Sequence, residues 1–168
     1  DFFGQPEDQW KERIKELIPR FRVCFGQGIN IRMINEEVAQ ALYKIEYRDN
    51  KFNSRRLYTA WDNLGDEKRF FDGVNILNKH GIPSKHLMAY MLIGYDKKET
   101  WDRIHYRFNR MVEHGILPFP MVYDNTNKDL KRFQRWAVRG MYRSYTFDSF
   151  YKYCYPKDFN QYKESQTQ

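Results

Sequence analysis

The sequence has 168 residues and a formal net charge of +7, with 41% hydrophobic and 18% aromatic residues. This length favours one domain with its own core, and two cysteines, Cys24 and Cys154, exclude a disulfide framework and match no zinc or cluster spacing. Because no run reaches the ~18 apolar residues that span a bilayer, we expect a cytoplasmic protein.

Helical patterns alternate with strand-like runs along the chain. The first helix begins near Pro6, carries an apolar stripe that includes Trp10 and Ile14, and ends at Pro19. Asn35 is expected to cap the second helix, and Asn127 the fifth. Strand-like runs lie at residues 20–28, 55–63, 86–95 and 118–125, at the ~30–35-residue spacing of βαβ units.

Two similar segments, NKHGIP and VEHGILP, each follow a helical pattern and precede a strand-like run. Their glycines, Gly81 and Gly115, suit the left-handed residue just past a helix end. Continuous apolar strands that alternate with helices predict a parallel α/β sheet with both faces covered. Two architectures fit this order: an open doubly wound sheet and part of a (β/α) barrel.

In both architectures, ligands bind at the carboxyl ends of the strands. Each predicted strand ends in residues that can hydrogen-bond or turn, namely Gln27 and Gly28, Asp62 and Asn63, Gly94, Tyr95 and Asp96, and Tyr123, Asp124 and Asn125. Residues of these types also start ordinary turns. Their recurrence at four strand ends favours a binding site.

The run MLIGYDKKET resembles the fifth strand and following loop of radical S-adenosylmethionine enzymes, with Gly94 and the Glu99–Thr100 pair matching. The usual Pro-Gly between them is replaced by Tyr95, Asp96 and two lysines. DFFGQP, FGQGINIRMINEEVAQAL, YTAWDN and ILPFPMVYDN resemble the second, third, fourth and sixth strand regions in the same order. The resemblance implies a partial (β/α) barrel of about four consecutive parallel β/α units, preceded by a helix, over residues 1–145. Residues 146–168 would form an aromatic-rich extension with a disordered end.

The resemblance also implies a cofactor site. Asp62 and Gln27 would hydrogen-bond the ribose or the methionine part of S-adenosylmethionine. Gly94 would let the backbone approach the adenine, because a Cβ there would collide, and Tyr95 would stack on the base. Asp1 would lie near the amino group of the cofactor.

Arg32 is expected to bind a carboxylate or a substrate phosphate, with a structural ion pair as the alternative. The family's CxxxCxxC motif, which holds a [4Fe–4S] cluster, is missing, and neither cysteine supplies it. Either the cluster segment and the first two strands lie upstream of Asp1, which the start at a strand end favours, or the chain has lost this chemistry. In both cases we expect a chain that cannot itself cleave the cofactor. The exposed sheet edge beside residues 20–28 would favour self-association. The sequence assigns no catalytic residue, metal ligand or substrate.

A second hypothesis follows from the positive charge. Arg132, Arg135, Arg139 and Arg143 recur at the spacing of one helix face, which suits a nucleic-acid backbone as well as a solvated outer helix face. On this interpretation the chain is a non-catalytic basic α/β module.

Overall fold

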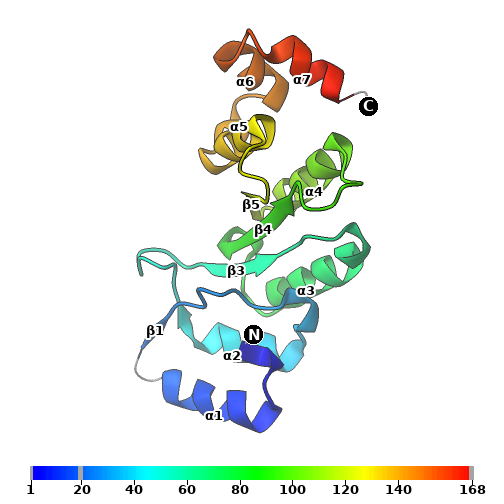
Figure 1. Cartoon of the computed structure of the whole chain (residues 1–168). Helices are drawn as coiled ribbons and strands as arrows, with labels where there is room; N and C mark the ends of the chain where they lie inside the picture. Colours follow the sequence, from blue (N-terminus) through cyan, green and yellow to red (C-terminus); the bar gives the residue numbers. More distant parts are fainter. Residues whose placement is uncertain (1, 19–20, 167–168) are drawn as a thin grey trace.

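The computed structural model describes residues 2–18 and 21–166. Its helices and strands follow the chain from one end of the molecule to the other (Figure 1). The strands are β1 (Arg22–Val23), β2 (Glu46–Tyr47), β3 (Leu57–Ala60), β4 (Leu87–Ile93) and β5 (Leu117–Val122). The α-helices are α1 (Glu7–Leu17), α2 (Glu36–Lys44), α3 (Glu67–Lys79), α4 (Trp101–Glu113), α5 (Lys128–Val138), α6 (Phe147–Cys154) and α7 (Phe159–Ser165). Short 3-10 helices are η1 (Phe2–Gly4), η2 (Ile31–Met33), η3 (Leu64–Asp66), η4 (Ser84–His86) and η5 (Met141–Arg143).

The central sheet is parallel, with strand order β3-β4-β5. Thr59 pairs with Ala89 across the first pair of strands, and Tyr90 pairs with Phe119 across the second. Helices α3 and α4 connect the strands, so the chain is an α/β protein whose parallel strands alternate with helices. The sheets do not close into a barrel.

The prediction of one long first strand over residues 20–28 is wrong. Only Arg22–Val23 is a strand, and it pairs with β2 in a separate two-stranded parallel sheet. A turn at Gly26 and Gln27 ends the extended run, and the chain then lies beside β3, where the Ile29 N–H donates to the Tyr58 carbonyl at 2.7 Å. The β3–β5 sheet therefore has three strands, and residues near Ile29 touch its edge without forming a fourth.

Helix ends follow the side chains that can cap them. The Asn35 side chain accepts from the Val38 N–H, and Asn127 accepts from the N–H groups of Asp129 and Leu130, which confirms both predicted caps. Pro6 is the N-cap of α1 and precedes the first helical residue. Pro19, the expected end of that helix, lies outside the described residues.

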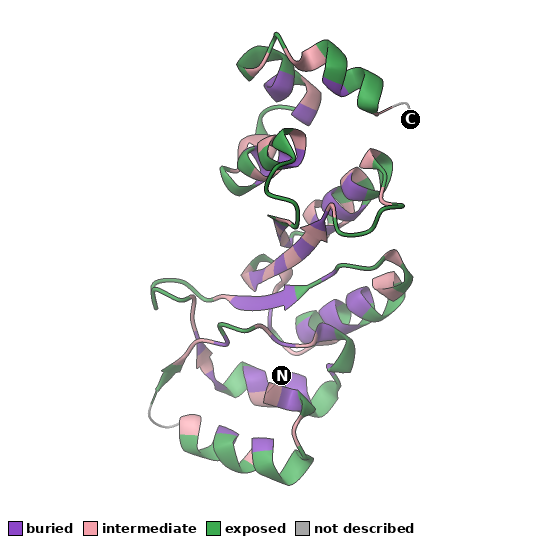
Figure 2. Cartoon of the chain, viewed as in Figure 1, coloured by how far each residue is buried: buried purple, intermediate pink, exposed green. Residues whose placement is uncertain are grey.

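The two faces of the central sheet are covered differently. Along β4, Leu87, Ala89, Met91 and Ile93 are buried, whereas the residues between them are half-buried (Figure 2). The buried face lies against helices, as shown by the Trp61 ring, which stacks on Phe70 of α3 with centroids 5.3 Å apart. The expectation that both faces are covered holds fully for one face only, because on the other face Tyr58 of β3 is buried while the β4 residues are half-buried.

The β5 edge of the sheet is closed to a further strand. Because Tyr123 donates its N–H to the Ile93 carbonyl, the odd-numbered residues of β5 face β4, and Pro118 and Pro120 face outward. Proline has no N–H, and the outward carbonyl of Pro120 accepts from Gln134 Nε2 at 2.9 Å. At the other edge of the sheet the chain near Ile29 lies against β3, and the self-association predicted for the edge beside residues 20–28 stays a prediction.

The C-terminal residues form two helices that pack on α4 and α5. The Tyr151 ring of α6 stacks on Tyr162 of α7 with centroids 4.2 Å apart, and the Trp101 ring of α4 packs against both Phe147 and Tyr162. The expected disordered end at residues 163–168 is wrong for its first part, because α7 extends to Ser165. Residues 167 and 168 lie outside the described part of the chain.

Candidate functional site

The carboxyl ends of β3, β4 and β5 surround a cavity. It has a volume of about 860 Å³ and is lined mainly by the residues that follow β3 and the loop 95–99. Its lining residues are Asp62, Asn63, Leu64, Tyr95, Asp96, Lys97, Lys98, Glu99, Arg103, Arg107 and Tyr123. We call this the strand-end cavity. Its position agrees with the rule that ligands of parallel sheets bind at the carboxyl ends of strands.

Asp62 is the carboxylate of this cavity that follows β3 directly. Its Oδ1 accepts the Leu92 N–H at 2.6 Å, so the side chain also joins the ends of β3 and β4. The residue is exposed to solvent, and its second oxygen makes no hydrogen bond with another described residue. A carboxylate held in this way can accept hydrogen bonds from a ligand while its orientation is fixed by the backbone.

Arg32 lies near Asp62 in a smaller neighbouring cavity of about 240 Å³. Its Nη1 donates to Asp66 Oδ2 at 2.7 Å, and its Nε donates to Asn30 Oδ1 at 3.2 Å. The guanidinium therefore makes the structural ion pair that was one of its two predicted roles.

Gln27 lines a third cavity, of about 250 Å³, with Arg32, Ala60 and Tyr90. It is exposed in the turn before Ile29, so it lies near the end of β3 although it does not line the strand-end cavity. Asp1, the remaining predicted contact to the cofactor, lies outside the described residues.

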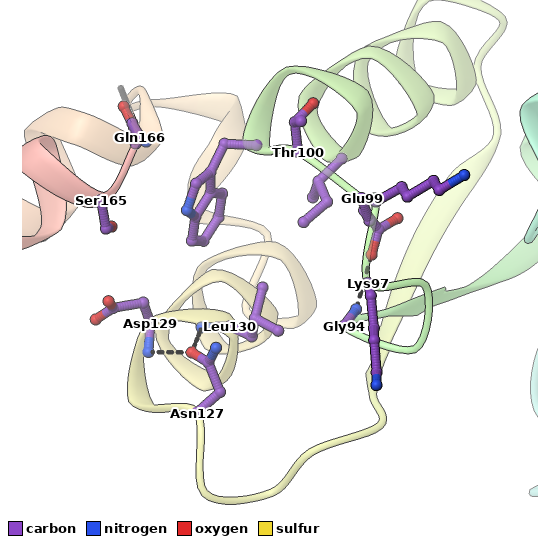
Figure 3. A pocket seen from close by; sticks show the side chains of 12 residues that line it. Gly94, Lys97, Glu99, Thr100, Asn127, Asp129, Leu130, Ser165 and Gln166 are labelled. Carbon is purple, nitrogen blue, oxygen red and sulfur yellow. Dashed lines mark hydrogen bonds between the residues drawn. The ribbon is translucent and has the colours of Figure 1, made fainter. Parts of the chain in front are cut away.

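Gly94 lies at the end of β4 with φ +77°. A Cβ at this position would lie 2.5 Å from Leu130 Cδ1, so an added methyl group would have to displace the Leu130 side chain, and the positive φ itself favours glycine. Its N–H donates to Glu99 Oε2 at 2.7 Å, which draws the loop 94–99 into a tight turn. Gly94 lines the cavity of about 610 Å³ between α4, α5 and α7, on the other side of this loop (Figure 3).

A buried ion pair holds the strand ends together. Arg107 of α4 is 1% exposed and pairs with Glu99, whose side chain is 10% exposed. The guanidinium also donates to the carbonyls of Trp61 at 3.0 Å, Asp62 at 3.2 Å and Leu92 at 3.0 Å. Because both charges are paired and hydrogen-bonded, their burial is tolerated. The pair thereby fixes the ends of β3 and β4 against the loop that carries Tyr95.

The sequence analysis missed Arg107, since arginine is usually a surface residue. A signal was present: Arg107 lies three residues after Ile104 and four before Met111, which places it within the apolar stripe of α4. An arginine in such a stripe, with Glu99 just before the same helix, indicates a buried pair.

Tyr95 and Tyr123 extend from neighbouring strand ends. They are 64% and 60% exposed, and their rings meet edge to face with centroids 5.0 Å apart. Tyr123 appeared in the sequence only as a strand-end residue, and the structure places it against Tyr95 in the strand-end cavity.

The arginines proposed to bind nucleic acid do not share one helix face. Helix α5 ends at Val138, Gly140 has φ +69°, and Arg143 lies in η5. The Arg132 side chain is 14% exposed and donates to Asp158 Oδ2 at 2.5 Å, while Arg135 donates to the Tyr155 hydroxyl at 2.8 Å. These contacts fasten the C-terminal helices to α5.

Metal-binding side chains do not cluster within residues 2–18 and 21–166, where no group of three or more His, Cys, Asp or Glu could hold an ion. Cys24 is half-buried after β1, and burial, followed by the nearby Asp49 charge, raises the pKa of its thiol. Cys154 is exposed at the end of α6. Among the described helices, none is long and apolar enough to cross a membrane.

Comparisons with known proteins leave the family open. No protein-family model matches the chain, and no curated protein or solved structure shows significant similarity to it.

Proposed function

We propose that this chain contributes the S-adenosylmethionine-binding strand ends of a radical S-adenosylmethionine enzyme, in which β3, β4 and β5 belong to a partial (β/α) barrel. The observation that carries the proposal is the convergence of Asp62, Tyr95 and Tyr123, from three consecutive parallel strands, on one cavity. An arrangement with neighbouring strands in sequence order is what successive barrel units require.

The residues present suit the cofactor. A cavity of about 860 Å³ lies within the usual size range of small-molecule sites. The Asp62 carboxylate offers acceptors for the two ribose hydroxyls, and the exposed Tyr95 ring offers a stacking surface for the adenine. Gln27 supplies an amide near the β3 end for the methionine part. Gly94, which was expected to let the backbone approach the adenine, lines the neighbouring cavity of about 610 Å³ instead.

The same residues do not suit an iron–sulfur cluster. Such a cluster needs thiolates gathered at one place, whereas Cys24 follows β1 and Cys154 ends α6. The proposal therefore assigns no cluster ligand to this chain. S-adenosylmethionine supplies an adenosyl radical when a cluster reduces it, and the part of these residues is to bind and orient the cofactor.

One test reads the coding sequence upstream of Asp1. The proposal expects a CxxxCxxC motif within ~60–80 residues, the length of about two βα units. An upstream sequence without any cysteine motif of this kind would contradict it.

A second test measures equilibrium binding of S-adenosylmethionine to the chain and to Asp62→Asn. Asparagine keeps an oxygen for the Leu92 N–H but loses the charge, so the fold should persist. We expect affinity to fall about tenfold, as for loss of a charged hydrogen-bond acceptor. Asp72→Asn, on the exposed side of α3 and paired with Lys68, is the matched control and should bind as the unchanged chain does.

A further inference from the structure

The less covered face of the central sheet carries a row of aromatic rings that runs from the buried Tyr58 to the strand-end cavity. Tyr58 stacks on Tyr90 with an interplanar angle of 8°, and Tyr90 meets its cross-strand partner Phe119 edge to face at 5.5 Å. On the same face of β5, Met121 is 45% exposed and is followed by Tyr123. We call Tyr90, Phe119, Met121, Tyr123 and Tyr95 the aromatic track.

The track is half-buried at Tyr90 and Phe119 and becomes exposed at Met121, Tyr123 and Tyr95. The helices α3 and α4 pack on the opposite face, where alternate residues of β4 are fully buried, and the track side is half-buried (Figure 2). Exposed apolar surface that is continuous over several residues marks an interaction site. Its flat rings suit a planar aromatic partner, because stacking needs only a π-face.

Positively charged side chains lie at the end of the aromatic track formed by Tyr95 and Tyr123. Lys97 and Lys98 line the strand-end cavity and form no ion pair with any described residue, and Arg103 approaches Asp96 only to 3.9 Å. Three carboxylates also face the cavity. Glu99 is neutralised by Arg107, Asp62 accepts a backbone N–H, and Asp96 lies beside Arg103. The net charge of +7 favours an anionic partner over a cationic one.

We propose that the aromatic track and the adjoining Lys97, Lys98 and Arg103 bind single-stranded nucleic acid, with bases stacked on the rings and phosphates beside the cations. Exposed aromatic rings on a sheet face, flanked by positive charge, are how proteins hold unpaired bases. The site differs from the arginines of α5, of which Arg132 is paired with Asp129 and Asp158 and Arg135 donates to the Tyr155 hydroxyl. The idea that this nucleic acid is the substrate of radical chemistry rests on the proposed function. The binding of nucleic acid does not.

The test measures fluorescence anisotropy of a labelled oligothymidylate with the whole chain, beside an abasic oligonucleotide of equal length. We expect the base-bearing strand to bind about tenfold or more tightly, since stacking contributes with each base. The double variant Phe119→Leu/Tyr123→Leu keeps apolar volume but removes two π-faces, and should lose this preference. Lys97→Met/Lys98→Met should weaken the binding of both oligonucleotides and reduce the magnitude of the slope of log affinity against log salt by about 1.4.

The matched controls are Tyr153→Leu, an exposed tyrosine of α6, and Lys51→Met/Lys152→Met, which remove equal charge elsewhere. Circular dichroism checks that every variant folds. Equal affinity for abasic and base-bearing strands, or an unchanged preference in Phe119→Leu/Tyr123→Leu, would overturn the proposal. So would a dimer in sedimentation that dissociates in this variant, because the track would then be a protein interface. If the unchanged chain bound the oligonucleotide but not S-adenosylmethionine, only the proposed function would be contradicted.

Discussion

Arg107 shows how one side chain can position several strand ends. Its guanidinium donates to the Trp61 carbonyl after β3 and to the Leu92 carbonyl near the end of β4, and Glu99 balances its charge. A buried pair of this kind adds little net stability, yet losing one partner leaves the other charge and its carbonyls unsatisfied. The strand-end cavity therefore depends on Arg107 although Arg107 is hidden beneath it.

Replacing Arg107 with methionine should lower the free energy of unfolding by about 3–5 kcal/mol, as for breaking a buried ion pair. Arg103→Met, an exposed change on the same helix, should cost less than about 1 kcal/mol. Urea unfolding of both variants measures the difference. Equal effects of the two substitutions would show that the pair does not hold the strand ends.

Gly94 and Gly115 allow backbone strain to be separated from packing. Both have positive φ, but an added Cβ meets Leu130 at 2.5 Å in the first case and Ser84 Cβ at 3.8 Å in the second. Gly115→Ala should cost about 1–2 kcal/mol from the left-handed conformation alone. Gly94→Ala should cost about 1–3 kcal/mol more, because the core around Leu130 is overpacked. Thermal unfolding of the two variants compares them, and similar costs would contradict the predicted clash.

At the scale of elements, α4 and α5 both connect the sheet to the C-terminal helices. His105 of α4 lies among aromatic rings, with Phe133 at 5.3 Å and Phe147 at 6.0 Å between centroids. Burial lowers the pKa of His105, and the charges of Asp148 and Asp102 oppose this only in part. Burial, with Arg55, Lys85 and Arg56 nearby, also lowers the pKa of His86.

These histidines predict how stability depends on pH. A histidine whose folded pKa lies below its unfolded value stabilises the fold above the unfolded pKa, and this stability is lost as pH falls toward the folded pKa. The free energy of unfolding should therefore fall between about pH 7.5 and 5.5, around the ordinary histidine pKa. His105→Phe should flatten the dependence, leaving the part that comes from His86. Urea midpoints across this range measure it, and an unchanged slope in the variant would exclude His105 as a source.

The prolines of β5 give the sheet one closed edge. Pro118→Thr/Pro120→Thr would place two N–H donors on the outward side of this strand, where another chain can pair. We expect the double variant to associate at concentrations where the unchanged chain does not, as measured by sedimentation velocity. Pro83→Thr, before η4, is the control. A monomeric double variant would show that other features, such as Gln134, close the edge.

Across the whole molecule, the sequence predicted those features that depend on neighbouring residues. Asn35 and Asn127 predicted helix starts, and Gly81 and Gly115 predicted helix ends. The continuous apolar runs predicted β3, β4 and β5. Two-residue strands such as β1 and β2 carry no periodicity, so their pairing was not predictable. The less covered face was missed because the residues between the buried ones on β4, such as Met88, Tyr90 and Leu92, are themselves apolar.

The candidate site was predictable in position more than in detail. The strand-end rule brought Asp62, Tyr95 and Tyr123 to one edge, since parallel strands end together. It did not show that Arg32 pairs with Asp66, that the Gly94 backbone packs against Leu130, or that Arg107 is buried beneath the strand-end cavity. Each of these depends on contacts between residues far apart in the chain, which local patterns do not encode.

The central claim, that the strand ends form a site for S-adenosylmethionine, is tested most directly by following backbone amide NMR signals during titration with the cofactor. We expect saturable shifts concentrated at Gln27, Asp62, Asn63, Gly94 and Tyr95, and weaker binding in Asp62→Asn. Shifts confined to other parts of the chain, or none at cofactor concentrations near 10 mM, about tenfold above a weak millimolar dissociation constant, would contradict it.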